Sequence, residues 1–328
     1  MSAQGWPARA AVIGVGTMGT GFAQLLALAG IETTVADAAP ELARAGAERA
    51  VELARRFEGD GLMPPGSAEA IEQRVTHASS IEEAVAGAGF VIEAVREDAE
   101  VKRDAFRRIA AAAPADAVVA SNTSAIPIRE LATAFDDGTR FLGTHWFNPP
   151  QWVPSVEVIP GPSTAPEVIE RVHGLLRRLG KRPATVGDAA GFVANRIQFA
   201  MFKEAASIVD DGVATAEEVD EVVRASFGFR LPFFGPFRIA DMAGLDVYEG
   251  AYRALESDLG ERFSIPPSVA ELVARGRLGT KSGGGYSDVP ADVLPELVAW
   301  RDRAYVELSA LLDRLEREAP ATKKDGEA

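Results

Sequence analysis

The chain has 328 residues, of which 47% are hydrophobic and 25% charged, and a globular protein of this length has room for two domains. Zero cysteines exclude disulfides, thiol nucleophiles and cysteine-ligated metals, and only three widely separated histidines argue against a histidine-rich metal site, so we expect no metal. The formal net charge of −14 argues against a nucleic-acid partner or an anionic membrane, and an anionic ligand would need local donors.

No apolar run approaches the ~18 residues that a membrane-spanning helix needs. The first residues also lack the basic segment, apolar segment and cleavage site of a secretory signal. We therefore expect a cytoplasmic enzyme that acts on a small molecule.

The first predicted elements form a strand, a helix and a second strand around a glycine-rich loop. An apolar strand covers residues 9–13, and the helix after the loop ends at Gly30. The second strand, residues 33–36, ends in Asp37, which lies 23 residues after Gly14. The loop and the start of the helix consist of Gly14, Val15, Gly16, Thr17, Met18 and Gly19.

This arrangement suits a dinucleotide. Gly14 allows the tight turn, Gly16 lets the backbone approach a pyrophosphate, and Gly19 lets the helix pack against its strand. The free N–H groups of the helix start favour phosphates. Asp37 would accept hydrogen bonds from ribose hydroxyls and repel a 2′-phosphate, so the pattern predicts NAD rather than NADP. A loop that merely turns would not explain Asp37 or its spacing.

Further strands are predicted to bring polar residues to one edge of the sheet. The apolar run 90–95 contains Glu93 and is followed by Glu97, and the helix 98–112 carries Lys102. The strand 117–120 is followed by polar residues ending in Ser124, which either faces a ligand at this edge or caps the next helix. The two roles are compatible.

A histidine lies near the middle of the chain. His145 follows a short strand predicted to end at Gly143, and Pro149 and Pro150 prevent that strand from continuing. An imidazole titrates near neutral pH and suits proton transfer, although a lone histidine is often structural. Glu157, flanked by apolar residues in the strand 156–159, is the predicted partner of this histidine; the alternative is a solvent-facing carboxylate.

The pattern changes to long helices after a last strand at 183–186. We predict an α/β fold, a Rossmann-type doubly wound sheet in residues 1–187 followed by an all-α C-terminal domain in residues 188–328. Asn195 lies in the first turns of a long helix, where asparagine invites a hydrogen-bonding role. The glycine-rich segment 276–286 carries Lys281 and is either a phosphate-contacting lid or a solvent loop. The main predicted helices are 192–211, 216–225, 236–255 and 293–318.

Several motifs, in order and with matching spacing over about residues 8–287, make the sequence resemble the L-3-hydroxyacyl-CoA dehydrogenase family. This family includes 3-hydroxybutyryl-CoA dehydrogenases and the related L-gulonate 3-dehydrogenase, or lambda-crystallin. The matching motifs are Gly14–Gly21, Glu93–Glu97, Ser121–Ser124, His145–Pro150, Val156–Val158, Gly191–Arg196, Gly235–Asp241 and Lys281–Tyr286.

The resemblance implies an NAD-dependent enzyme that oxidises the 3-hydroxyl of an acyl thioester and works as a homodimer joined through its helical domain. It implies that His145 is the catalytic base, that Glu157 orients it, and that Ser124 and Asn195 hold the reacting oxygen. It also implies which residues contact the cofactor besides the glycine-rich loop. These residues are Asp37, Glu97, Lys102, Ser124, Asn148 and Lys281.

The sequence departs from the family pattern where the substrate would bind. Acyl-CoA members carry a lysine-rich helix after the second strand, whereas this helix has Arg49, Arg55 and Arg56 among glutamates. The C-terminal helix and Pro149-Pro150 resemble the gulonate branch, while Trp146-Phe147 suits an acyl chain. The first hypothesis is a hydroxyacyl-CoA substrate; the alternatives are a free 3-hydroxy acid such as L-gulonate, or a non-catalytic dinucleotide-binding or structural protein.

Overall fold

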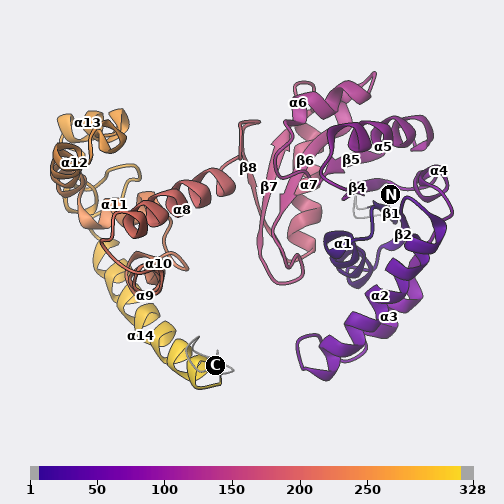
Figure 1. The fold of residues 1–328 in the computed structure, drawn as a ribbon, viewed down its shortest axis with the longest axis horizontal. Helices are drawn as coiled ribbons and strands as arrows, with labels where there is room; N and C mark the ends of the chain where they lie inside the picture. Colours follow the sequence, from indigo (N-terminus) through magenta and orange to yellow (C-terminus); the bar gives the residue numbers. More distant parts are fainter. Residues whose placement is uncertain (1–6, 319–328) are drawn as a thin grey trace. The chain divides into compact units, whose positions relative to one another are not determined.

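The computed structural model describes residues 7–318. The chain divides into two compact units between Phe202 and Lys203 (Figure 1). Within the described residues, the first unit contains a sheet with covering helices, and the second unit is helical. No helix in that part of the chain is both long and apolar enough to cross a membrane.

The first unit is built on one eight-stranded sheet in the order β3-β2-β1-β4-β5-β6-β7-β8. Neighbouring strands pair in parallel, except β6 and β7, which are antiparallel. This confirms the predicted Rossmann-type sheet. The strands are β1 (Arg9–Ile13), β2 (Glu32–Ala36), β3 (Val75–His77), β4 (Phe90–Glu93), β5 (Val118–Ser121), β6 (Phe141–Trp146), β7 (Ser155–Pro160) and β8 (Arg182–Thr185).

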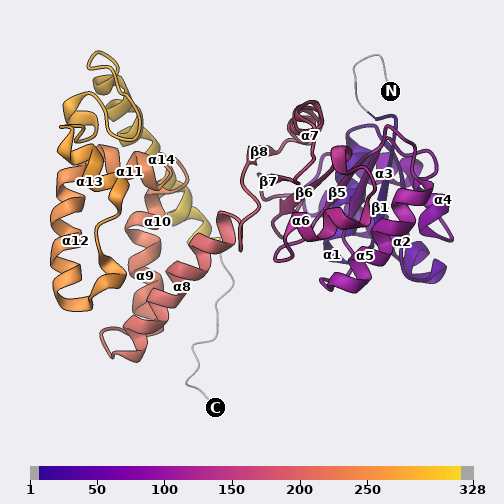
Figure 2. The same ribbon diagram turned by 90° about the horizontal axis from the view of Figure 1, so that it is seen from above.

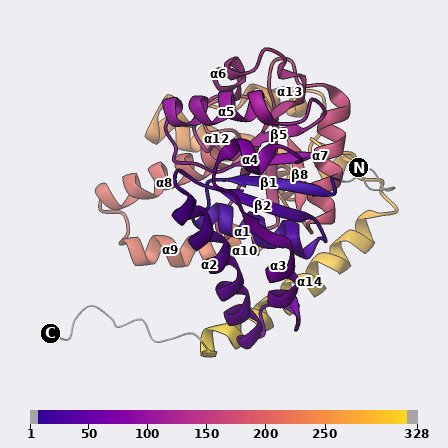
Figure 3. The same cartoon turned by 90° about the vertical axis from the view of Figure 1, so that its right-hand side faces the viewer.

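Helices cover both faces of this sheet, because alternate residues of the central strands are apolar on each side. Ala10 and Val12 of β1 belong to one buried cluster, and Ala11 and Ile13 belong to the other. Figure 3 shows α5 and α6 on one side of the sheet and α1, α2 and α3 on the other. The first cluster packs under α1 (Thr17–Leu28), α2 (Pro40–Gly59), α3 (Ser67–Arg74) and α7 (Pro166–Arg178), and the second under α4 (Ile81–Val85), α5 (Ala99–Ala112) and α6 (Ile128–Leu131).

Local sequence sets several helix ends. Pro40 and Pro166 occupy the first turns of α2 and α7, where a missing N–H costs nothing. Asp98 caps α5 by accepting hydrogen bonds from the backbone N–H groups of Glu100 and Val101. The short 3-10 helices η1 (Ala132–Ala134) and η2 (Gly138–Arg140) connect α6 to β6.

The predicted strand end at Gly143 is wrong. β6 continues through His145 to Trp146, because the first residue that cannot join the ladder is Pro149, three residues further on. His145 is therefore held by strand pairing rather than by the turn alone.

The second unit begins at Lys203, inside α8 (Ala194–Asp210), and contains the helices that follow it. Figure 2 shows these helices. The single helix predicted over 236–255 is wrong: Gly244, at φ 105°, separates α11 (Pro236–Ala243) from α12 (Leu245–Leu259). The other elements are α9 (Ala216–Ala225), α10 (Phe227–Arg230), η3 (Glu261–Phe263), α13 (Pro267–Ala274), η4 (Thr280–Ser282) and α14 (Leu294–Glu318).

Aromatic contacts attach α14 to the second unit. Trp300 packs against Phe233 and Phe234, with ring centroids 5.8 and 5.6 Å apart, and Tyr305 packs against Phe229 at 5.5 Å. The aromatic residues of this C-terminal helix therefore pack on the body of its own chain.

Candidate active site

The glycine-rich loop joins β1 to α1 at the carboxyl edge of the sheet. Gly14 has a φ of 92°, which favours glycine, and a Cβ on Gly19 would lie 1.9 Å from the Gly14 carbonyl oxygen. A Cβ on Gly16 would meet no atom within 4 Å, so this side of the loop is open. Thr17 and Met18 begin α1, whose first N–H groups lack intrahelical acceptors. These features fit a phosphate-binding loop.

Asp37 follows β2 and contacts this loop. Its Oδ2 accepts a hydrogen bond of 2.7 Å from the backbone N–H of Val15, and its Oδ1 accepts one of 2.7 Å from that of Ala38. The carboxylate is thus fixed beside the loop and keeps further lone pairs for a ligand.

A cavity of about 610 Å³ lies next to the loop and Asp37. Its size and its mixture of apolar and charged walls are typical of a small-molecule site. It lies at the carboxyl edge of the sheet, where doubly wound folds bind nucleotides. The lining residues include Gly14, Gly16, Asp37, Ile81, Arg96 and Arg108.

A buried ion-pair network occupies the end of β4. Lys102 of α5 is 1% exposed, and its Nζ lies 2.7 Å from Glu93 Oε1 and 3.2 Å from Glu97 Oε2. Glu93 also accepts a hydrogen bond of 2.7 Å from the hydroxyl of Ser121, the last residue of β5. Burial raises the pKa of Glu93, while the charge of Lys102 opposes that rise. The network joins the ends of β4 and β5.

Glu97 in turn holds the Ser124 loop. Its Oε1 accepts hydrogen bonds of 3.0 Å from the backbone N–H groups of Ser124 and Ala125 and one of 2.5 Å from the Thr123 hydroxyl. Asn195, in the first turn of α8, donates from Nδ2 to the Ser124 carbonyl at 3.3 Å. Three predicted site residues are therefore linked: Glu97, Ser124 and Asn195.

His145 and Glu157 lie directly opposite each other on β6 and β7. The two residues are 3% and 4% exposed, and Glu157 Oε2 lies 2.6 Å from His145 Nδ1. Because the carboxylate accepts, Nδ1 carries the hydrogen, which leaves Nε2 as the basic nitrogen of the neutral ring. The two residues form the predicted pair.

The start of α8 fixes the other oxygen of Glu157. Its Oε1 accepts hydrogen bonds of 2.9 Å from the Val193 N–H and 3.0 Å from the Ala194 N–H. Phe192, at φ 49°, makes the preceding turn and packs against the His145 ring with centroids 5.5 Å apart. Two donors and one histidine thus hold the carboxylate in a single orientation.

Trp146 and Pro150 face the core rather than this pair. The Trp146 ring packs against Phe22 of α1, with centroids 5.0 Å apart, and is 5% exposed. A Cβ on Gly21, also in α1, would lie 2.4 Å from the Pro150 ring. These two residues anchor the turn on α1, so neither supplies a substrate-facing surface. The apolar residue beside His145 is Phe147, whose ring lies 4.7 Å from it.

The sequence comparison adds decisive evidence. Residues 9–189 match the family model for the NAD binding domain of 3-hydroxyacyl-CoA dehydrogenase, and residues 191–289 match the model for its C-terminal domain. The chain belongs to the 3-hydroxyacyl-CoA dehydrogenase family. It is an NAD-dependent oxidoreductase of this type, as the glycine-rich loop and Asp37 predicted.

Three relatives illustrate the similarity. The chain is 36% identical to 5-formyl-3-hydroxy-2-methylpyridine 4-carboxylate 5-dehydrogenase of Mesorhizobium japonicum, over 92% of this chain and 97% of the relative. It is 36% identical to a probable 3-hydroxybutyryl-CoA dehydrogenase of Bacillus subtilis, over 84% of this chain and 96% of the relative. The crystal structure of a 3-hydroxyacyl-CoA dehydrogenase from Archaeoglobus fulgidus matches with a TM-score of 0.75 and 31% identity, over 94% and 99%.

Other predicted residues of this dehydrogenase lie outside the linked set. Asn148 is exposed and precedes Pro149 through a cis peptide. Lys281 belongs to the second unit, where its Nζ lies 2.5 Å from Asp246 Oδ1. The segment around it is packed rather than open: the buried carboxylate of Asp241 accepts hydrogen bonds of 2.9 Å from the N–H groups of Tyr286 and Ser287.

Sequence reasoning missed Lys181 as a residue that shapes the site. It is 5% exposed, and its Nζ donates to the carbonyls of Pro150, Gln151 and Val153 at 2.5, 3.1 and 2.9 Å. It therefore holds the turn that follows His145. A lone lysine before a short strand gave no signal of this role.

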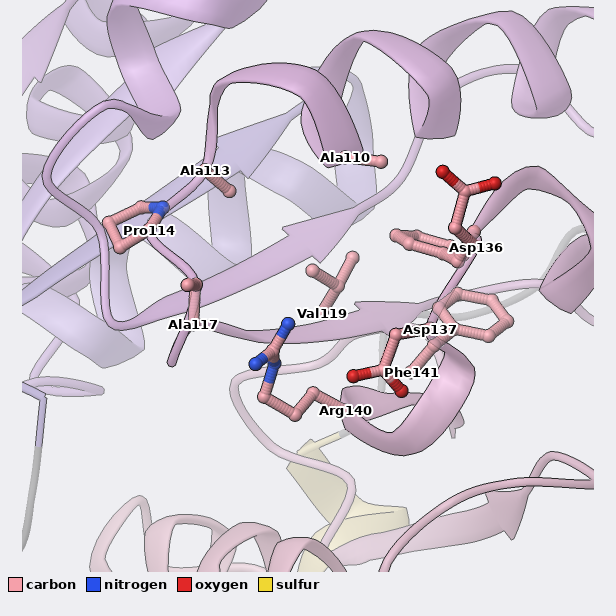
Figure 4. A pocket seen from close by; sticks show the side chains of 11 residues that line it. Ala110, Ala113, Pro114, Ala117, Val119, Asp136, Asp137, Arg140 and Phe141 are labelled. Atoms are coloured by element: carbon pink, nitrogen blue, oxygen red, sulfur yellow. The ribbon is translucent and has the colours of Figure 1, made fainter.

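A second cavity, of about 280 Å³, lies at the opposite edge of the sheet (Figure 4). It is lined by Ala117 and Val119 at the start of β5, by Phe141 at the start of β6, and by Asp137 and Arg140. None of the predicted site residues lines it, and nucleotides bind doubly wound sheets at the other edge. The first cavity is therefore the candidate site for the cofactor.

Proposed function

We propose that this dehydrogenase oxidises the 3-hydroxyl of a 3-hydroxy acid or its acyl thioester to the keto product, with His145 as the base. The observation that carries the proposal is the buried pair of His145 and Glu157, in which Nδ1 is committed and Nε2 is the basic nitrogen. His145 Nε2 takes the hydroxyl proton as the hydroxyl carbon loses its hydride. Bound NAD supplies the hydride acceptor.

Glu157 supports this chemistry electrostatically. Once protonated, the imidazolium lies 2.6 Å from a carboxylate whose other oxygen already accepts two backbone hydrogen bonds. The pair therefore stabilises the positive charge that develops on the ring and keeps its orientation constant. In the reductive direction the same histidine returns the proton.

The remaining roles concern binding. We propose that Ser124 and Asn195 hold the reacting oxygen, supported by the hydrogen bond that joins them. We propose that the cofactor is contacted by the following residues: Gly14, Val15, Gly16, Thr17, Met18, Gly19, Asp37, Glu97, Lys102, Ser124, Asn148 and Lys281.

The charge of α2 favours a free 3-hydroxy acid as the substrate. Coenzyme A carries several phosphate charges, and a surface that binds it needs unpaired cations. Two of the four arginines of α2 are engaged: Arg55 pairs with Glu72 at 2.8 Å, and Arg49 donates to the Thr20 hydroxyl at 3.3 Å and to the Val15 carbonyl. The helix has four arginines and four glutamates, and the sequence contains no lysine before Lys102. The name of the Mesorhizobium relative likewise mentions no coenzyme A.

A 3-hydroxyacyl-CoA thioester is the second candidate. It is supported by the names of the Bacillus and Archaeoglobus relatives, which cover 84% and 94% of the chain. Phe147 beside His145 gives an apolar surface that suits a short acyl chain.

Steady-state NADH formation with matched substrates separates the two candidates. The purified enzyme is assayed with 3-hydroxybutyryl-CoA, free 3-hydroxybutyrate and L-gulonate at equal NAD. We expect kcat/KM for a free acid to exceed that for the thioester by at least roughly tenfold. The reverse order would overturn the free-acid assignment and leave the base chemistry intact; no turnover of any hydroxy compound would overturn both.

We also propose that the enzyme is a homodimer joined through its second unit. Large apolar side chains are exposed there on the isolated chain, including Val222 (63%), Phe237 (59%) and Val306 (70%). Light scattering after size exclusion should give twice the chain mass of 34.7 kDa. A mass equal to that of one chain at micromolar concentration would contradict this.

A further inference from the structure

The dinucleotide cavity belongs to a strongly acidic protein, yet it must accept a diphosphate. Its charged lining residues are two acids, Asp37 and Asp104, and two bases, Arg96 and Arg108. The net charge of −14 repels an anionic cofactor at long range. A local cation at the cavity would offset this repulsion, so the availability of each base matters.

Arg108 is not available. Its Nε and Nη2 lie 2.7 and 2.9 Å from the two oxygens of Glu82, a bidentate pair. The hydrogen bond from Arg108 is the main reason that the pKa of Glu82 is lowered to about 2. This pair neutralises the Arg108 charge at the cavity wall.

The other bases near the loop are also committed. Arg49 donates to the Val15 carbonyl and to the Thr20 hydroxyl, so it braces the loop from α2. Lys102 is buried and shared between two carboxylates.

Arg96 differs from all of these. It is exposed, lines the cavity, and lies three residues past Glu93, the end of β4, at the carboxyl edge of the sheet. Within residues 7–318 its guanidinium makes no hydrogen bond or ion pair. The nearby Asp98 carboxylate is already the cap of α5, accepting from Glu100 and Val101. Arg96 therefore has its donors free at a cavity that Gly14 and Gly16 of the loop also line, and Gly16 is open on this side.

We propose that Arg96 is a cofactor-affinity residue that binds the diphosphate of NAD by charge. The glycine-rich loop supplies neutral N–H donors, and Arg96 supplies the positive charge that the loop lacks. The role concerns cofactor binding alone, so it is independent of the hydroxy substrate proposed above.

Equilibrium binding without any hydroxy substrate tests this proposal. Calorimetry gives the Kd of ADP-ribose, NADH and adenosine for the wild type and for Arg96→Ala. We expect Kd for ADP-ribose and NADH to rise roughly tenfold, the size of one charge-assisted contact at a partly exposed site. Adenosine lacks phosphate, so its Kd should stay within about twofold. The slope of log Kd against log salt for ADP-ribose should also become shallower.

Two further variants make the test specific. Arg96→Lys keeps the charge and should recover the Kd of ADP-ribose to within about threefold of wild type. Arg107→Ala is the control. Arg107 is an exposed residue of α5 that does not line the cavity, and its substitution makes the same change in net charge. Equal Kd values for Arg96→Ala and Arg107→Ala would overturn the proposal. An equal loss of adenosine binding would also overturn the proposal, because it would place Arg96 against the adenine ring rather than the diphosphate.

Discussion

Glu157 faces His145 across the antiparallel pair of β6 and β7, with Oε2 2.6 Å from Nδ1. This is the one antiparallel pairing in the sheet of the described residues. Opposite residues of an antiparallel pair project to the same face of the sheet. The reversal of β7 thus brings a carboxylate 12 residues away in sequence onto the histidine.

His145→Ala removes the proposed base. We expect kcat with the best hydroxy substrate to fall by roughly 10²–10⁴, the usual contribution of a positioned general base. The Kd for NADH should change by less than about twofold, because the ring does not line the cofactor cavity. Turnover within a factor of ten of wild type would disprove the assignment of His145.

Glu157→Gln tests the charge of the partner separately from its shape. The amide oxygen can still accept from the N–H groups of Val193 and Ala194, but the negative charge beside the imidazolium is lost. We expect kcat to fall by roughly 10–10³ and NADH binding to be kept. An active variant with wild-type kcat would show that the carboxylate charge is dispensable.

Lys102→Met should strongly destabilise the first unit. It leaves Glu93, 0% exposed, without its cation, and breaking a buried ion pair costs about 3–5 kcal/mol. The double variant Glu93→Gln, Lys102→Met removes both charges and should recover part of that loss. Urea unfolding at pH 7 measures both free energies. A single variant no less stable than the double variant would show that Lys102 does not neutralise Glu93.

We expect Glu82 to make the free energy of unfolding depend on pH in the acid range. The pKa of Glu82 is lowered from 4.5 to about 2, mainly by the hydrogen bond from Arg108. A carboxyl group with a depressed folded-state pKa contributes stability above its unfolded pKa of 4.5, and loses it as the pH falls toward 2. Because the pair is nearly half exposed, its contribution is about 0.5–1 kcal/mol after solvent screening.

The matching measurement compares wild type with Glu82→Gln in urea at several pH values. We expect the difference in unfolding free energy to be constant from pH 5.5 to 7 and to shrink below about pH 4.5. A difference that grows on acidification would have the wrong sign.

Asp37→Asn tests cofactor selection. The variant keeps a carbonyl acceptor for the Val15 N–H but loses the charge that repels a 2′-phosphate. We expect the preference for NADH over NADPH, measured as a ratio of Kd values, to fall by roughly tenfold. An unchanged ratio would mean that another feature of the cavity excludes the phosphate.

Much of this fold follows from local pattern. Apolar runs of strand length, glycines at fixed spacing and helix caps lie close together in sequence, so periodicity predicted the sheet and most of its covering helices. The errors have local causes too. Gly244 divides a predicted helix because its backbone lies at φ 105°, and β6 passes Gly143 because pairing with β7 continues to Trp146.

By itself, the sequence determined the residue types of the site: a glycine-rich loop, an acid after the second strand, and one histidine near a strand end. Only the tertiary structure decided which of them act together and which face away. Trp146 follows His145 directly in β6, yet it packs on α1, because successive strand residues point to opposite faces. Pro150, in the turn beyond the strand, also contacts α1. Likewise, the sequence does not distinguish Arg96 from Arg108. Only the structure shows that Glu82 pairs with Arg108 and leaves Arg96 unpaired.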